Sequence, residues 1–210
     1  MRLGASFFIA GAAAVISTAA PAQASLPQVA AHLKALGSMT ADFTQTSASG
    51  AVARGKLTLA RPGRIRFQYE PSVPLLIVAD GKSLAMIDYE VAQVSKWPIR
   101  GTPLGVLLDP NVDISKYGRV LPVGQGGMPG FVTVEAKDKK HPEYGTITMY
   151  FASNAQAPGG LALSAWRVLD AQGNVTQVQL SNPRYNVAVD NSAFTYRDPR
   201  RTARGPRGRG

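Results

Sequence analysis

The sequence contains no cysteine, and this absence excludes several kinds of chemistry. A chain of 210 residues without cysteine forms no disulfide and offers no thiolate to a metal ion or a substrate. It also has no thiol to which a lipid could be attached. A domain of this length can instead rely on a full-sized hydrophobic core, because it buries enough apolar surface without covalent crosslinks.

Histidine is almost as scarce. The two histidines are His32, in an amphipathic segment, and His141, in a turn with lysine and proline; neither has a metal ligand three or four residues away. We expect both to be surface residues. Zinc binding and catalysis by a histidine-activated nucleophile are therefore not predicted. The sequence predicts neither an enzyme nor a cofactor.

Long hydrophobic runs are also missing. The apolar run 7–16 follows Arg2 and precedes Ala22-Gln23-Ala24, an order typical of a secretory signal peptide. We expect cleavage after Ala24, which makes residues 1–24 the signal peptide and the mature protein soluble and exported. No later run approaches the roughly 20 apolar residues of a transmembrane helix. Export without disulfides fits a bacterial periplasm.

Acidic residues are too few to balance the basic ones, and the net charge is +10. Most of this charge lies in a tail rich in arginine and glycine, so about +4 remains for residues 25–196. We expect residues 198–210 to be disordered. The tail could attract anionic lipid headgroups or be a solvated end without a partner. Nucleic-acid binding is not predicted, because export and the apolar setting of the aromatic residues argue against it.

Two short motifs resemble known sites but lack their context. Gly81-Lys82-Ser83 matches the end of a phosphate-binding loop, but Leu76 stands where that loop needs glycine. Asp80-Gly81 between two apolar runs instead predicts a β-hairpin with a type I′ turn. Asn174-Val175-Thr176 matches a glycosylation acceptor, which means little in a bacterial protein.

The dominant pattern of the chain is alternation of apolar and polar residues. In segment 57–69, Leu57 and Leu59 precede an Arg61-Pro62-Gly63 turn, and Ile65, Phe67 and Tyr69 follow it at every second position. This is the period of two strands with one buried face. Arg64 and Arg66 alternate with the apolar residues and are expected to face solvent.

The rest of the chain repeats this pattern with few helices. Amphipathic helices are predicted over 25–37 and 102–109, the second with Thr102 as N-cap and Pro103 at its first position. Further strands are predicted over 39–45, 75–78, 83–88, 93–97, 117–121, 131–135, 146–151, 161–169, 176–180 and 194–196. Short strands in such number, with so few helices, predict an antiparallel barrel or sandwich. It is either closed and filled with side chains or partly open around an apolar cavity.

A series of short motifs resembles the periplasmic outer-membrane lipoprotein carrier family over nearly all of residues 25–197. In chain order they are Asp42-Phe43-Thr44-Gln45, Gly55-Lys56-Leu57-Thr58-Leu59, Arg61-Pro62-Gly63-Arg64-Ile65-Arg66-Phe67, Val78-Ala79-Asp80-Gly81-Lys82, Gln93-Val94, Thr102-Pro103-Leu104, Val189-Asp190 and Phe194-Thr195-Tyr196. The resemblance implies a mainly β fold: an unclosed antiparallel β-barrel of about 11 strands, with a few short α-helices capping a hydrophobic cavity.

The resemblance also implies a function without covalent chemistry. Such a protein is a periplasmic monomer that shields lipoprotein acyl chains and carries them from an inner-membrane ABC transporter to an outer-membrane acceptor. Arg61 stands at the family's Arg-Pro arginine, which implies a latch that hydrogen-bonds the helical lid and holds the empty cavity shut. The residues then expected to line the cavity are Leu57, Leu59, Ile65, Phe67, Tyr69, Ile77, Met86, Trp97, Leu104, Leu107 and Phe151.

Two features depart from the family pattern. After Asp80-Gly81-Lys82, familiar members carry aromatic residues, whereas this chain has Ala85-Met86-Ile87, so the cavity wall and its cargo could differ. The basic tail has no counterpart in that pattern. Two alternatives therefore stay open: a periplasmic sensor that binds a membrane-anchored signalling protein, and a general lipid shuttle.

Overall fold

The computed structural model describes residues 26–99, 104–108 and 113–201. The predicted signal peptide, Thr102, Pro103 and residues 202–210 lie outside these ranges. The strands are β1 (Ser38–Thr46), β2 (Val52–Ala60), β3 (Arg64–Tyr69), β4 (Leu75–Asp80), β5 (Ser83–Asp88), β6 (Gln93–Pro98), β7 (Gly118–Leu121), β8 (Phe131–Lys137), β9 (Thr146–Ser153), β10 (Leu161–Leu169) and β11 (Val175–Tyr185). The helices are α1 (Leu26–Ala35), α2 (Leu104–Leu108) and α3 (Ile114–Tyr117), with short 3₁₀ turns η2 (Pro142–Tyr144), η3 (Pro158–Gly160), η4 (Asn191–Phe194) and η5 (Pro199–Arg201).

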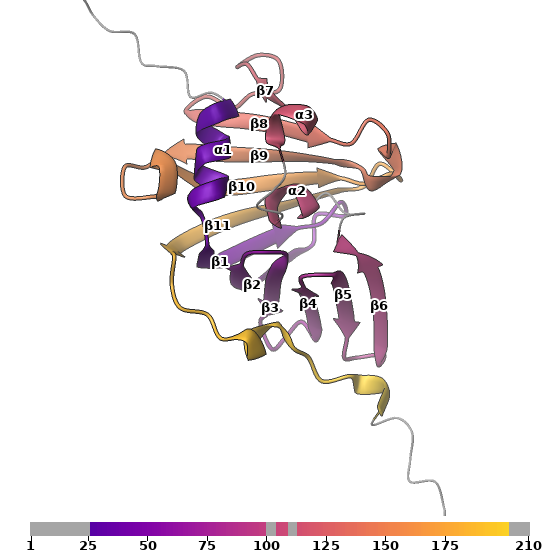
Figure 1. The fold of residues 1–210 in the computed structure, drawn as a ribbon. Coiled ribbons are helices and arrows are strands. Elements are labelled where there is room, and N and C mark those ends of the chain that lie inside the picture. The colour runs from indigo at the N-terminus through magenta and orange to yellow at the C-terminus, as the bar shows by residue number, and fades with distance from the viewer. Residues whose placement is uncertain (1–25, 100–103, 109–112, 202–210) are drawn as a thin grey trace, which may run out of the picture.

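All eleven strands belong to one antiparallel sheet. Their order is β6-β5-β4-β3-β2-β1-β11-β10-β9-β8-β7, so β6 and β7 are the two edges although they follow one another along the chain. The connection between them carries α2 and α3 instead of a pairing (Figure 1). The predicted unclosed sheet of about eleven strands with few helices is therefore confirmed.

The two faces of the sheet are covered differently. We call the face against which α1 packs the inner face and the opposite one the outer face. Leu57, Leu59, Ile65 and Phe67 belong to the same buried cluster as Leu33 of α1. Strand alternation places their neighbours Lys56, Thr58, Arg64 and Arg66 on the outer face. Figure 1 shows α1 lying across the strands of one half of the sheet.

The core of the inner face is held by aromatic rings that meet edge to face. The ring of Phe43 in β1 lies 5.3 Å from that of Phe67 and 5.1 Å from that of Tyr69. Phe67 also meets Trp166 of β10 at 6.0 Å. These contacts join β1 and β3 to β10, which lies far from them in the sequence. The rings therefore hold the curved sheet together and bury its inner face.

The β4–β5 hairpin is present, but its turn differs from the prediction. Among the residues of this turn only Gly81 has positive φ, at 101°, whereas a type I′ turn needs two such residues. The carboxylate of Asp80 accepts hydrogen bonds from the backbone N–H groups of Lys82 and Ser83, both at 2.9 Å. Side-chain capping by Asp80 therefore shapes the turn in place of left-handed backbone at that residue.

The C-terminal part also departs from the prediction. Residues 194–196 do not form a strand; Phe194 ends η4, which Asp190 caps by accepting a hydrogen bond from Ser192 N–H at 2.7 Å. The chain remains in regular contact as far as η5, which packs against β6. The part of the predicted tail before residue 202 is thus attached to the edge of the sheet (Figure 1).

Candidate functional site

Arg61 stands in the tight turn between β2 and β3. Its guanidinium donates a hydrogen bond to the backbone carbonyl of Leu107, and Gly63 N–H donates to the carbonyl of Leu108 at 3.1 Å. The last carbonyls of a helix have no partner within it, so these bonds satisfy the C-terminal end of α2. The turn therefore ties α2 to the sheet.

Glycine is required at this turn because two turns meet there. Gly63 has a φ of 70°, and a Cβ on it would lie 2.8 Å from Cα of Gly81 in the β4–β5 turn. Such an approach is too short for any side chain. The Arg-Pro-Gly sequence thus places the guanidinium of Arg61 beside α2 with a second turn packed behind it.

The predicted lining residues differ in their exposure. Leu57, Leu59, Ile65, Phe67, Tyr69, Leu107 and Phe151 belong to one buried cluster, and Ile77 packs against it partly buried. Leu104 lies in α2, but its side chain is outside the described part. Met86 is half-buried and pairs with Ile77, and Trp97 pairs with Leu84. Paired residues share a face, so Met86 and Trp97 also belong to the inner face.

The inner face is most exposed at β4–β6. Trp97 in the edge strand β6 exposes 44% of its surface, whereas Phe151 in β9 is fully buried. Ile77, Leu84 and Met86 lie between these extremes. The half of the inner face under α1 is buried except at its edge strand β7, where Val120 is 38% exposed, and the half at β4–β6 is half-exposed.

Tyr69 brings a polar atom into this apolar face. Its hydroxyl donates a hydrogen bond to the Gln45 side-chain oxygen at 2.8 Å. Burial raises the pKa of Tyr69 to about 12, so the phenol stays neutral at physiological pH. It satisfies its hydrogen bond at the end of β3 and leaves the ring free to pack against Phe43.

His32 is buried, contrary to the expectation of a surface residue. Its side chain is fully enclosed, and its Nδ1 lies 2.7 Å from the carbonyl oxygen of Pro158. The helical spacing of α1 places His32 beside Val29 and Leu33 on the inward side, whereas the sequence alone suggested that its polar ring would face water. His141 is exposed in the turn before β9, where Nδ1 lies 3.0 Å from Glu143, as expected.

Arg64 and Arg66 are not the free solvent-face charges that alternation suggested. Arg66 donates hydrogen bonds to the carbonyls of Ala193 at 3.1 Å and Thr195 at 2.9 Å. Arg64 donates to the side chain of Asn191 and lies over the Phe194 ring, 5.2 Å from its centre. The two arginines clamp the C-terminal segment onto the outer face, which no local pattern could have revealed.

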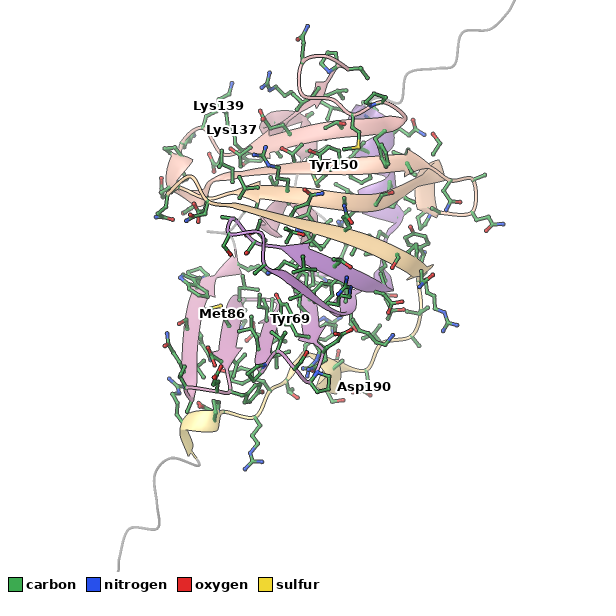
Figure 2. All side chains as sticks on the ribbon, turned by 180° about the vertical axis from the view of Figure 1, so that it is seen from behind. Tyr69, Met86, Lys137, Lys139, Tyr150 and Asp190 are labelled. Atoms are coloured by element: carbon green, nitrogen blue, oxygen red, sulfur yellow. The ribbon has the colours of Figure 1, made fainter. Side chains whose placement is uncertain are left out.

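The C-terminal segment covers a second, smaller apolar cluster. Phe194 is buried with residues from β2, β4 and β5, all on the outer face. Tyr196 continues this cover, and the ammonium of Lys96 lies 5.6 Å from the centre of its ring. Figure 2, which views the sheet from behind, places Asp190 at the start of this cover, beyond the strands that carry Tyr69 and Met86.

Within the described residues, polar groups do not assemble into a catalytic or metal centre. No three histidine, aspartate or glutamate side chains in those ranges come close enough to hold a metal ion. An open polar recess of about 390 Å³ lies near the outer face, lined by Asp42, Phe43, Thr44, Arg54, Gly55, Lys56, Glu70 and Ser181. Its charged rim does not suit an acyl chain. No described helix is long and apolar enough to cross a membrane.

The fold and the site together define an open antiparallel sheet with a helical cover over an apolar face. Residues 34–197 match the family model described as outer membrane lipoprotein carrier protein LolA. The chain therefore belongs to the LolA family, a family of carriers and not of enzymes.

Curated relatives agree with this assignment, and a solved structure shares the fold. The chain is 31% identical over 200 residues to the outer-membrane lipoprotein carrier protein of Chromobacterium violaceum, covering 91% of this chain and 93% of the relative. It is 27% identical over 180 residues to that of Bordetella avium, covering 82% of each. A DUF1329 family protein from Desulfovibrio piger shares the fold, with a TM-score of 0.50 at 10% identity, over 81% of this chain and 95% of that one.

Proposed function

We propose that this protein is a periplasmic, monomeric carrier that takes lipoproteins from an inner-membrane ABC transporter, shields their acyl chains on the inner face, and delivers them to an outer-membrane acceptor. The observation that carries the proposal is the bond from the Arg61 guanidinium to the carbonyl of Leu107. It closes α2 over a face that is mainly apolar and is half-exposed at β4–β6.

The inner face suits acyl chains because it offers apolar contact and little hydrogen bonding. Each CH₂ group removed from water contributes about 0.8 kcal/mol, so a chain of about sixteen carbons gains on the order of 10 kcal/mol. Ile77, Met86 and Trp97 form the half-exposed part, where a first chain can bind without disturbing the packed core. Full shielding then requires α1 and α2 to move away from the sheet.

Arg61 acts as a latch in this scheme. Its planar guanidinium holds a backbone carbonyl of α2, and such a bond contributes about 1 to 3 kcal/mol when the donor is charged. Cargo that displaces α2 breaks the bond, and release of cargo restores it. The latch makes the empty closed form and the loaded open form comparable in free energy, as a carrier that must both take up and give up its ligand requires.

The test is a hand-over assay with purified components. The mature chain is incubated with a triacylated lipoprotein released by the transporter, isolated with its cargo, and mixed with acceptor-containing outer-membrane vesicles. We expect the wild-type chain to load and to transfer. Arg61→Leu should load but transfer at least tenfold less, because the closed form no longer competes for the inner face.

The matched control is Arg184→Leu, which removes an exposed arginine of β11 on the outer face and should transfer normally. Normal transfer by Arg61→Leu would reject the latch. A mature wild-type chain that neither carries lipid from the periplasm nor accepts a lipoprotein would reject the carrier. Stoichiometric binding of a membrane-anchored signalling protein without transfer would instead favour the sensor alternative.

A further inference from the structure

The side chain of His32 holds α1 from its buried side. The imidazole lies on the buried side of α1, between the ring of Phe151 at 5.5 Å and the ring of Tyr185 at 6.4 Å, and meets both edge to face. It is the one ionisable side chain of α1 that is buried, since Lys34 is exposed. A polar ring enclosed by aromatic neighbours needs a specific hydrogen bond to offset its burial.

That hydrogen bond fixes the protonation of the ring. The partner of Nδ1 is the carbonyl oxygen of Pro158, 2.7 Å away, and a carbonyl can only accept. Nδ1 therefore carries the proton, and in the neutral ring Nε2 has a lone pair. Within the described residues, Nε2 is buried without a hydrogen-bond partner. The ring is thus held at one nitrogen and enclosed at the other.

The backbone of η3 is fitted closely to α1 at the same point. Gly159 has a φ of 65°, and a Cβ on it would lie 2.8 Å from the backbone nitrogen of His32 and 2.9 Å from its Cα. A side chain cannot be accommodated at that distance. The Pro158-Gly159 turn and His32 therefore form one docking point between α1 and the loop that precedes β10.

Further attachments lie at the C-terminal end of α1, where the backbone N–H of Arg61 donates a hydrogen bond to the carbonyl of Gly37 at 2.8 Å. Asn186 accepts a hydrogen bond from Gly37 N–H at 2.9 Å and donates one to the carbonyl of Ala35 at 3.4 Å. This tether holds the end of the helix where the chain enters β1. The bond from His32 is the specific polar contact on the buried side of the helix, and it involves neither α2 nor the Leu107 carbonyl.

We propose that His32 is a second latch, which holds α1 against η3, so that the parts of the inner face beneath α1 and beneath α2 are uncovered by two separate releases. The proposal rests on the carrier function for its biological meaning. Arg61 then controls α2, and His32 controls α1, with the tether at Asn186 acting as the pivot. A carrier built this way can admit a first acyl chain under one helix while the other remains closed.

The buried ring also makes the second latch sensitive to acid. Burial lowers the pKa of His32 below its ordinary value of 6.5, because it outweighs the hydrogen bond to Pro158, which raises the pKa; the positive charge of Arg61 adds a smaller lowering. The ring is therefore neutral when α1 is closed and protonates more readily when α1 is open. Closure is fully favoured above about pH 6.5 and weakens as the pH falls below it.

The titration of His32 depends on the charged and titratable groups that face its ring. Among the described residues, the charged and titratable neighbours are Arg61 of the β2–β3 turn and Tyr185 of β11, while β9 presents Phe151 and η3 presents a carbonyl and a glycine. In the two elements next to α1 at its other side, Lys116 of α3 pairs with Asp113 and Arg119 of β7 pairs with Glu135. The carboxylates of Asp113 and Glu135 are thus paired with these cations, and neither is among the groups that shift the pKa of His32.

The absence of cysteine makes the two releases measurable in the cargo-free mature protein. Single thiols are introduced by Val29→Cys under α1 and by Leu107→Cys in α2, both at fully buried positions. Ile147→Cys, buried in β9, reports global unfolding, and Val52→Cys, which is 52% exposed, corrects for thiol reactivity at each pH. The rate of thiol modification under native conditions reports how often each position is uncovered.

The expected result is a separation between the two helices. His32→Phe keeps an aromatic ring but loses the donor, and should speed modification at position 29 about five- to tenfold while position 107 changes by less than twofold. Arg61→Leu should do the reverse. Position 147 should stay protected in both. Equal acceleration at positions 29 and 107 in either variant, or no change at position 29 in His32→Phe, would overturn the proposal.

The pH profile separates a latch from a merely packed residue. In the wild-type background, corrected opening at position 29 should rise by up to tenfold per pH unit below pH 6.5. His32→Gln keeps an N–H donor and cannot titrate, so its profile should be flat, and its protection at neutral pH should exceed that of His32→Phe. A wild-type acid response that persists in His32→Gln would contradict the second latch. Because cargo is absent, these outcomes are independent of whether the protein carries lipoproteins.

Discussion

The two halves of the inner face carry the same alternating pattern but differ in burial. At β9 and β10, Met149, Phe151 and Trp166 are almost completely enclosed, whereas at β5 and β6 Met86 is half-buried and Trp97 is 44% exposed. Position in the sheet contributes for Trp97, which lies in the edge strand β6, but not for Met86, which lies in the interior strand β5. Among the described residues, α1 covers one half, and the short α2 lies near the end of the other. Cover by helices, and not strand pattern, divides the inner face into a core and a surface that can take a ligand.

The outer face also shows that a covering segment decides whether an apolar patch is buried. It has its own apolar cluster on β4 and β5, but there the C-terminal segment supplies the cover, held by Arg64 and Arg66. An apolar patch on this sheet is therefore sealed wherever a segment of the chain can be attached over it. Within the described residues, the β4–β6 half of the inner face is the largest part left half-exposed, which is why we place cargo entry there.

The largest expected effect is a difference in how much the two halves of the inner face contribute to the free energy of unfolding. Phe151→Ala should lower the free energy of unfolding by about 3 to 5 kcal/mol, because it leaves a cavity in the enclosed half. Trp97→Ala should cost less than about 1 kcal/mol, because the ring is already exposed. Urea denaturation of both variants measures the difference. Equal losses would mean that Trp97 belongs to the core and that the two halves do not differ.

The next effect concerns the cover on the outer face. Phe194→Ala should lower stability by about 2 to 3 kcal/mol, since the ring is buried but at the margin of a small cluster. Tyr89→Ala, at a position 39% exposed, is the matched control and should be nearly neutral. If denaturant midpoints of the two variants coincide, the C-terminal segment does not contribute the packing that we assign to it.

A charge introduced on the inner face at β4–β6 should impair ligand binding more than folding. Met86→Glu places a carboxylate beside Ile77 on the inner face and should weaken binding of a fluorescent acyl-chain probe tenfold or more, because an acyl chain cannot solvate the charge. Lys82→Glu, in the exposed β4–β5 turn, changes the charge more but should leave binding intact. Unimpaired probe binding by Met86→Glu would move the ligand away from β4–β6.

The smallest effect is a pH dependence at the turn packed behind Arg61. Hydrogen bonds from Ser83 and Lys82 N–H lower the pKa of Asp80 below its ordinary value of 3.8. The stability that they contribute is present above about pH 4 and is lost as the pH falls through the lowered pKa. Asp80→Asn should therefore reduce the acid dependence of Tm slightly, by about 2 °C or less. A scan of Tm between pH 2 and 5 that is identical in both proteins would contradict this role.

The sequence predicted the sheet well and the roles of its polar residues poorly. Alternation is a local property of a strand, so the segments around Leu57–Tyr69 and the other strands could be recognised without knowing their partners. His32, Arg64 and Arg66 could not, because their partners Pro158, Asn191, Ala193 and Thr195 lie more than a hundred residues away. The family resemblance singled out Arg61, but residue patterns alone would have left it a solvated turn arginine.

By itself, the sequence determined that the protein is mainly β, lacks thiol chemistry and carries one apolar face on most of its strands. These properties follow from composition and from a period of two residues, which need no long-range contact. Only the tertiary structure decided which part of that face is buried and which arginines hold other segments. It also decided that the side chain of His32 lies on the buried side of α1. Those outcomes depend on where α1, α2 and the C-terminal segment are attached, and such attachments join residues that the local pattern does not connect.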